Sequence, residues 1–262
     1  MRVELLGPLR VVTVEGTADI RAPQQRVLIA LLAVHVGCVV RSERLATVIW
    51  GDPPPARWRQ VLPPLIRRLR VSLGADDGRI LTSSPGYRLD VEPRRIDIWA
   101  FDALRKDGLA AALANDWEQA SRILTEAETL WRGTPFADIE SAELRDAWQE
   151  YLEDQYRDVR ETRLEADVRL SLRAARSAVA DLRKMVAADP ASERLRWLLM
   201  LALQRSGKQA DAQAAFRDAW TYSTSELASR PGPTLQSLNG RIIAADPGLL
   251  SVPFIDSTPP AT

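Results

Sequence analysis

The segment from Arg57 to Gly74 constrains the fold of this chain most, because it combines an apolar helical stripe, a cluster of arginines and two adjacent prolines. The stripe has spacings of four, three and four residues and consists of Leu62, Ile66, Leu69 and Leu73. This spacing predicts one face of a helix that stops near Gly74. The arginines lie before the helix or away from the stripe: Arg57, Arg59, Arg67, Arg68 and Arg70. Such a helix can rest on a small core and enter a DNA groove, although a solvated basic face gives the same pattern.

Pro63 and Pro64 oppose a regular helix over this whole segment. An interior proline removes a hydrogen bond and clashes with the carbonyl four residues earlier, at a cost of roughly 3 kcal/mol, whereas the first turn tolerates proline. We therefore expect the regular helix to begin at Leu62 or Pro63, with residues 57–61 as a separate turn or a kinked lead-in.

Charge divides the chain into a basic first third and an acidic remainder. Residues 1–95 contain 15 Arg and 9 Asp plus Glu, a net charge of +6, and residues 96–262 carry −6. A length of 262 residues suits two domains. The asymmetry predicts a first domain that faces a polyanion and a second domain with another role.

The sequence lacks the residues that are characteristic of several functional classes. His35 is the only histidine and Cys38 the only cysteine, which is too few for a zinc site, and Cys38 is expected to be a buried small residue. There is no glycine-rich phosphate loop or nucleophile–base pair, so we expect no enzyme, no metal and no cofactor. No apolar run reaches ~18 residues, and Glu4 and Pro8 interrupt any signal-peptide core, so we expect a cytoplasmic protein without a membrane span.

The first 95 residues predict a small sheet, three helices and a hairpin. Strands are expected within residues 1–14 and at 20–22, followed by a helix from Pro23, a helix over 43–50 capped by Ser42, and the basic helix. Two strands around Ser84-Pro85-Gly86 then form the hairpin. This order is typical of a winged helix-turn-helix domain, whose third helix reads the major groove.

From Asp97 onward the pattern is entirely helical. The predicted helices cover residues 100–115, 117–131, 142–172, 174–187, 192–206, 209–224 and 234–244. Small residues recur where neighbouring helices approach, which indicates a stack like tetratricopeptide repeats. Six of the eight tryptophans fall here, and we expect them in the core rather than around a ligand. The predicted organisation is a winged-helix domain over 1–95, a helical domain over 96–247 and a flexible tail over 248–262.

Ordered sequence blocks in both parts resemble the Streptomyces antibiotic regulatory protein (SARP) family over about residues 1–245. The blocks are Leu5–Val11, Pro23–Leu32, Val39–Leu45, Ile49–Pro54, Pro85–Leu89, Leu130–Gly133, Leu199–Leu203 and Pro231–Gln236. The resemblance implies an OmpR-type winged helix followed by a bacterial transcriptional activation domain. It further implies an activator of a secondary-metabolite (antibiotic) gene cluster, with promoter double-stranded DNA and RNA polymerase as partners and a head-to-tail homodimer on repeated sites. The chain departs from the family at Leu62–Arg67, where prolines replace a polar and an apolar residue.

The candidate DNA contacts follow from the basic helix and the hairpin. Phosphate or guanine contacts are assigned to Arg57, Arg59, Arg67, Arg68 and Arg70, with Gln60 as a base reader. Backbone phosphate contacts are assigned to Arg26, Arg79, Thr82 and Arg88. The loop containing Asp52, Pro53, Pro54 and Pro55 corresponds to the loop that can face RNA polymerase in OmpR-type regulators, and it can equally be a rigid connector.

The alternative hypothesis is a family member with lost or weakened sequence-specific DNA binding. Such a protein would act through its helical domain as a protein- or ligand-interaction module. Pro63, Pro64 and the modest charge of +6 favour this alternative.

Overall fold

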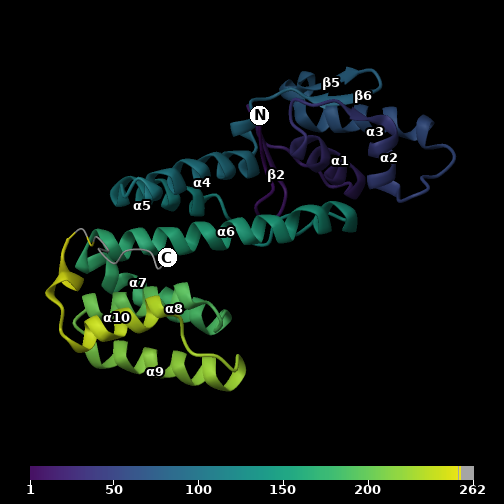
Figure 1. Cartoon of the computed structure of the whole chain (residues 1–262). Coiled ribbons are helices and arrows are strands. Elements are labelled where there is room, and N and C mark those ends of the chain that lie inside the picture. The colour runs from purple at the N-terminus through teal and green to yellow at the C-terminus, as the bar shows by residue number, and fades with distance from the viewer. Residues whose placement is uncertain (253, 255–262) are drawn as a thin grey trace. The chain divides into compact units, whose positions relative to one another are not determined.

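Two compact units make up the computed structural model, which describes residues 1–252 and residue 254 (Figure 1). The first unit contains residues 1–106 and 126–157, and the second contains 107–125 and the chain from 158 onward. Both units are therefore discontinuous in sequence. The predicted boundary at residue 95 does not coincide with any of the three junctions. The division into a domain over 1–95 and a domain over 96–247 stays a prediction.

A small antiparallel sheet begins the first unit. Strand β1 (Arg2–Glu4) pairs with β2 (Arg10–Thr13), which pairs with β3 (Gly16–Thr17). The expected strand at 20–22 is wrong, because Gly16, with φ +119°, turns the chain back directly onto β2. Val3 and Val11 stand opposite each other in this sheet and are both buried.

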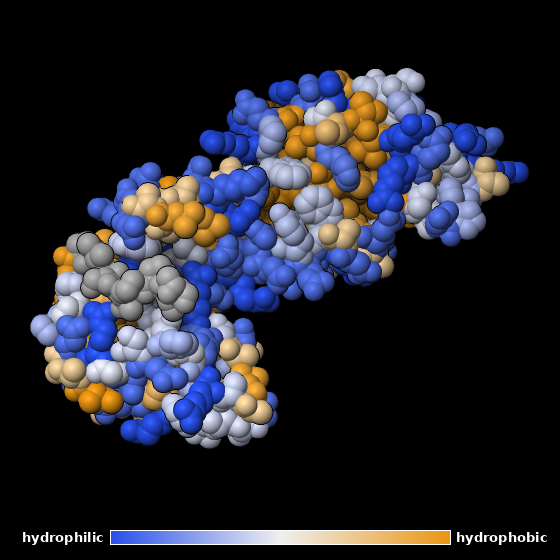
Figure 2. Space-filling view, viewed as in Figure 1, coloured by the Kyte–Doolittle hydropathy of each residue, from blue (hydrophilic) through white to orange (hydrophobic). Residues whose placement is uncertain are grey.

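Three helices follow the sheet: α1 (Pro23–Val34), α2 (Ser42–Trp50) and α3 (Trp58–Leu73), with the short strand β4 (Val40–Arg41) before α2. The predicted start of α1 at Pro23 is confirmed. Nine of its twelve residues are buried, and it packs on both α2 and α3. Ser42 is the first residue of α2 rather than its cap, and Arg41 holds the cap position without a side-chain hydrogen bond. On the visible face of the first unit, hydrophobic residues gather over the region of α1 (Figure 2).

Helix α3 runs without interruption from Trp58 to Leu73 and contains both prolines. The expected start at Leu62 or Pro63 is therefore wrong. Trp58 and Leu62 lie one turn apart and are both buried, so tertiary packing anchors the first turn. The N–H groups of Gln60 and Val61 donate to the Arg57 carbonyl at 2.9 and 3.3 Å, and the two proline rings are exposed.

The hairpin comprises β5 (Ile80–Ser83) and β6 (Gly86–Leu89), after a 3-10 turn η1 (Gly74–Arg79). Strand β6 lies between β5 and β4 in a second three-stranded sheet. Gly86 is required there, because a Cβ atom would lie 1.8 Å from the Val40 carbonyl oxygen. The predicted hairpin is confirmed.

Later parts of the chain complete the first unit. After the 3-10 turn η2 (Pro93–Arg95), residues 97–106 of α4 (Asp97–Leu113) and residues 142–157 of α6 (Ala142–Leu170) belong to it. The Asp97 carboxylate accepts the N–H groups of Leu5 and Leu6 at 2.7 and 2.8 Å. Asp138 accepts the Leu9 N–H at 2.8 Å, and Glu143 pairs with Arg44 on α2.

Asp97 is expected to give the protein a pH-dependent stability. Burial raises its pKa from 3.8 to about 6, against the lowering effect of the Leu6 and Leu5 N–H groups and of Arg132. Because the folded chain binds this proton more tightly than the unfolded chain, the contribution is fully present below about pH 4 and is lost as the pH rises through 6. The loss is at most about 3 kcal/mol.

Urea unfolding of the wild type and of Asp97→Asn between pH 4 and pH 7 measures this contribution. Asparagine does not titrate, so its own effect on stability stays constant while the wild type loses stability relative to it as the pH rises. Parallel curves for the two proteins would show that Asp97 does not titrate in this range.

The second unit is built from helices. It contains residues 107–125, which span parts of α4 and α5 (Trp117–Thr129), the end of α6, α7 (Leu172–Ala188), α8 (Glu193–Arg205), α9 (Gln209–Glu226) and α10 (Pro233–Ile243). Helix α8 packs on α7, α9 and α10 and is the most buried of these four (Figure 1). Leu172, predicted on the apolar face of a helix over 142–172, is 40% exposed. The chain breaks at Ser171, whose Oγ caps α7 through the Ala174 N–H at 3.0 Å, and this break resets the helical phase.

The beginning of the predicted flexible tail is packed against this unit. Pro247–Leu250 form a 3-10 turn (η3), and Leu249 and Phe254 are fully buried. The Phe254 N–H donates to the Arg169 carbonyl at 2.9 Å. Residue 253 and residues 255–262 of that tail lie outside the described residues.

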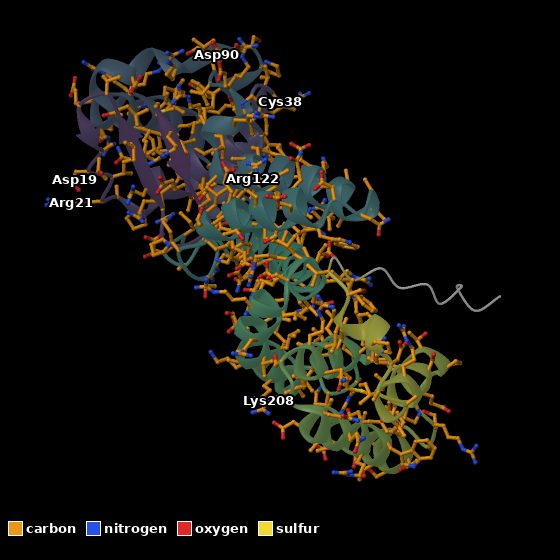
Figure 3. All side chains as sticks on the ribbon, turned by 90° about the vertical axis from the view of Figure 1, so that its left-hand side faces the viewer. Asp19, Arg21, Cys38, Asp90, Arg122 and Lys208 are labelled. Atoms are coloured by element: carbon orange, nitrogen blue, oxygen red, sulfur yellow. The ribbon has the colours of Figure 1, made fainter. Side chains whose placement is uncertain are left out.

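Cys38 is exposed and not buried as expected (Figure 3). Helix α1 ends at Val34, and the following turn, with Gly37 at φ +77°, carries the cysteine out to the surface before β4 begins.

Candidate nucleic-acid interface

The outer face of α3 carries two of the predicted contacts. Arg67 and Arg68 are both exposed, and among the described residues neither has an ion pair or a side-chain hydrogen bond. The opposite face holds the four residues of the predicted stripe, all of them buried: Leu62, Ile66, Leu69 and Leu73. A shallow hollow of about 550 Å³ runs along the outer face and is lined by Gln25, Pro64, Arg67, Arg68, Val71 and Ser72. The helix therefore presents two unpaired cations from a fixed backbone.

Three further candidates lie at the amino-terminal end of the same helix. Arg57, Arg59 and Gln60 are all exposed there. The Arg59 guanidinium lies 4.7 Å from the centre of the Trp58 ring and 3.8 Å from the Glu43 carboxylate. The positive end of the helix dipole adds to their charge, so this end of α3 favours an anion.

Arg70 and Thr82 are brought together, but in a role that the sequence analysis missed. The Arg70 guanidinium donates to the Ile80 carbonyl through Nε at 3.0 Å and to Thr82 Oγ1 at 3.1 Å. Arg70 therefore ties α3 to the first hairpin strand. In the sequence, Arg70 stands out only as an arginine one helical turn after Ile66. That spacing does not identify Thr82 as its partner.

The remaining arginines are partly neutralised. Arg79 lies 3.9 Å from Asp76, and Arg88 lies 3.4 Å from Asp90 at the end of the hairpin. Arg26 is engaged by other groups of the first unit, because it donates to the Ile20 carbonyl at 2.9 Å and pairs with Asp138. Arg79 and Arg88 retain exposed side-chain area, with 53% and 36% accessible.

The loop between α2 and α3 is a surface feature of the first unit. Asp52, Pro53 and Pro55 are exposed and Pro54 is half-buried. Gly51, with φ +95°, ends α2 and directs the chain into this loop.

In the part of the chain that the structure describes, no three His, Cys, Asp or Glu side chains are grouped as metal ligands would be. The single histidine has Nδ1 3.1 Å from the Leu31 carbonyl oxygen, in its own helical turn. Over the same residues, no helix combines the length and apolarity needed to cross a bilayer.

Comparison with known proteins identifies the family of this chain. The profile of the bacterial transcriptional activator domain matches residues 96–243. The regulatory protein DnrI of Streptomyces peucetius is 33% identical over 261 residues, which cover 95% of this chain and 94% of DnrI. The regulatory protein AfsR of Streptomyces coelicolor is 35% identical over 95% of this chain.

The solved structure of Mycobacterium tuberculosis EmbR, in complex with a low affinity phosphopeptide, superposes with a TM-score of 0.80 and 29% identity. The match covers 94% of this chain and 65% of that one, and the chain spans only 25% of AfsR. The relatives matched here are named as bacterial regulatory proteins. Within that class, the chain belongs to the Streptomyces antibiotic regulatory protein (SARP) family, as its sequence blocks indicated.

Proposed function

We propose that this chain is a transcriptional activator that binds promoter DNA through α3 and the β5–β6 hairpin. In this proposal α1, α2 and α3 with the hairpin are a winged helix-turn-helix, and α3 enters the major groove. The proposal rests mainly on Arg67 and Arg68. Both are exposed and have no described ion-pair partner, and they lie on one face of a helix whose other face is buried. Arginine reads guanine through O6 and N7 in the major groove, or binds phosphate, and both uses need a fixed backbone.

The other candidate residues take different roles in the proposal. Arg57, Arg59 and Gln60 lie where the helix dipole favours phosphate, and Gln60 also has the donor and acceptor needed to read adenine. Arg79 and Arg88 give the hairpin its phosphate contacts. Arg70 and Thr82 fix the hairpin against α3, and Arg26 is assigned to the contact with Asp138 rather than to DNA.

The proposed partners follow from family membership and from exposed surface. The loop of Asp52, Pro53, Pro54 and Pro55 is the proposed contact with RNA polymerase, since its residues are accessible. A homodimer on repeated promoter sites, and control of an antibiotic biosynthesis cluster, complete the proposal. The helical domain over 96–247, built as a tetratricopeptide-like stack, serves as the activation domain.

Binding of the purified chain to promoter DNA from its own gene neighbourhood, against scrambled DNA and across a salt series, tests the proposal. We expect a preference for the promoter and a log–log salt slope of about −4 to −5, as for about five neutralised phosphates. Equal, weak and salt-labile binding to both DNAs would contradict base readout. The chain would then act through its helical domain, as a protein- or ligand-interaction module.

A further inference from the structure

A cavity of about 270 Å³ lies within the first unit, between α4 and α6. Three aromatic rings form much of its wall: Trp99, Trp148 and Tyr151. Trp148 meets Trp99 edge to face, with ring centres 5.8 Å apart and planes at 84°, and meets Tyr151 at 6.3 Å and 83°. Rings set at right angles offer both a face and an edge to a planar molecule, which are the two arrangements that aromatic pairs prefer.

The side-chain oxygen of Gln155 is the polar atom of the cavity wall on which the inference rests. Gln155 lines the cavity, and its Oε1 atom is buried without a hydrogen bond. Buried acceptors in folded proteins are nearly always paired, so a donor from outside the chain would complete this group when the Gln155 side chain turns its amide toward the cavity.

The charged groups of the cavity already compensate one another. Asp102 accepts hydrogen bonds from Arg105 at 3.1 Å and pairs with Lys106 at 2.7 Å. Burial by itself would raise the pKa of Asp102, but these two cations outweigh it and lower the pKa. The carboxylate is therefore ionised and neutralised, so the cavity does not call for a cationic ligand.

We propose that this cavity binds a small, neutral, planar aromatic molecule that carries a hydroxyl group. Its ring packs against Trp99, Trp148 and Tyr151, and its hydroxyl donates to Gln155 Oε1. The volume is just below the range of typical ligand pockets, about 300–1,000 Å³, and so suits a molecule of one or two fused rings.

The cavity is also linked to the helices that carry the candidate interface. The Trp99 Nε1–H group donates to the Ala33 carbonyl in the last turn of α1, at 3.2 Å. Helix α1 packs directly on α3. A ligand that shifts the Trp99 ring therefore alters the support of α3. This regulatory consequence rests on the proposed DNA binding, whereas ligand binding itself does not.

Calorimetric titration of the full chain with 2-naphthol, and with 2-methoxynaphthalene as a probe that cannot donate, tests the site without DNA. We expect 2-naphthol to bind about five- to tenfold more tightly, the value of one hydrogen bond to a buried acceptor. Gln155→Leu should remove this preference. Gln149→Leu is the matched control, because Gln149 lies on the same helix outside the cavity and bonds to Glu153 at 2.9 Å. It should keep the preference.

Ala147→Phe provides a second test that does not remove any polar group. Ala147 is exposed and lines the cavity, so a ring at this position fills the space without disturbing the core. We expect loss of 2-naphthol binding with an unchanged melting temperature. Failure of the wild type to bind 2-naphthol at millimolar concentration, or full binding by Ala147→Phe, would overturn the site.

Promoter binding with and without 2-naphthol tests the link to α1. Ala147→Phe, whose cavity is filled, should show none of the shift in DNA affinity that 2-naphthol causes in the wild type. Calorimetric binding with no effect on DNA affinity would overturn the link alone. Absence of promoter binding altogether would instead contradict the proposed function and leave the calorimetric result standing.

Discussion

Replacing both Arg67 and Arg68 by alanine is expected to weaken promoter binding by about 100-fold or more, because each direct base contact contributes about 1–3 kcal/mol. Both side chains are exposed on the outer face of α3 and pair with no other described residue. Their loss should leave the fold intact. Electrophoretic or fluorescence titration of promoter and scrambled DNA measures the change.

The matched control is Arg173→Ala with Arg176→Ala on α7. These two arginines are also exposed and the net charge changes equally, but they lie in the second unit. The control should retain the promoter preference. If the α3 variant loses affinity equally for both DNAs and its salt slope falls by about two, the arginines bind phosphate rather than bases. Unchanged binding by the α3 variant would contradict the proposed interface.

Replacing Pro63 and Pro64 by alanine is expected to stabilise the protein by about 1–3 kcal/mol. Each proline lies inside α3, where it removes one backbone hydrogen bond at a cost of up to about 3 kcal/mol. Part of the gain is offset, because alanine makes the unfolded chain more flexible, by about 0.4–1 kcal/mol per residue. Both rings are exposed, so no core contact is lost.

Urea unfolding measures this gain, with Pro55→Ala as the control. Pro55 is exposed and precedes α3, so its replacement should lower the stability slightly through the unfolded chain alone. A decrease in stability on replacing Pro63 and Pro64 would show that α3 has adapted to its prolines. The same variant, tested on promoter DNA, then shows whether the prolines limit readout.

Local pattern was sufficient to predict most elements of this fold. The start of α1 at Pro23, the hairpin around Ser84-Pro85 and the helices after Asp97 depend on periodicity and on nearby breakers, which neighbouring residues determine. The start of α3 could not be predicted in this way, because burial of Trp58 outweighs the local effect of Pro63. The prediction that Cys38 is buried was wrong because it relied on the apolar residues next to Cys38 in the sequence. The exposure of Cys38 depends instead on where α1 ends.

The candidate interface was predictable only in part. Arg67 and Arg68 follow from helical geometry once the apolar stripe is known. The partners of Arg70 and Arg26 do not, because Thr82 lies across a turn and Asp138 lies 112 residues further along the chain. The cavity depends on the packing of α4 against α6. The number of tryptophans alone could therefore not show which of them lie in the core and which line the cavity.

The discontinuity of the first unit has a consequence for synthesis on the ribosome. The amino-terminal sheet and helices make contacts with segments that are translated much later. The Leu5 N–H donates to Asp97, Arg26 pairs with Asp138, and Arg44 pairs with Glu143. At about 5–20 residues per second, the segments up to residue 157 follow residue 95 by several seconds. During that interval the nascent helices α1 and α2 lack their acidic partners Asp138 and Glu143. The α1–α3 region can therefore complete these contacts only after α6 has emerged from the ribosome.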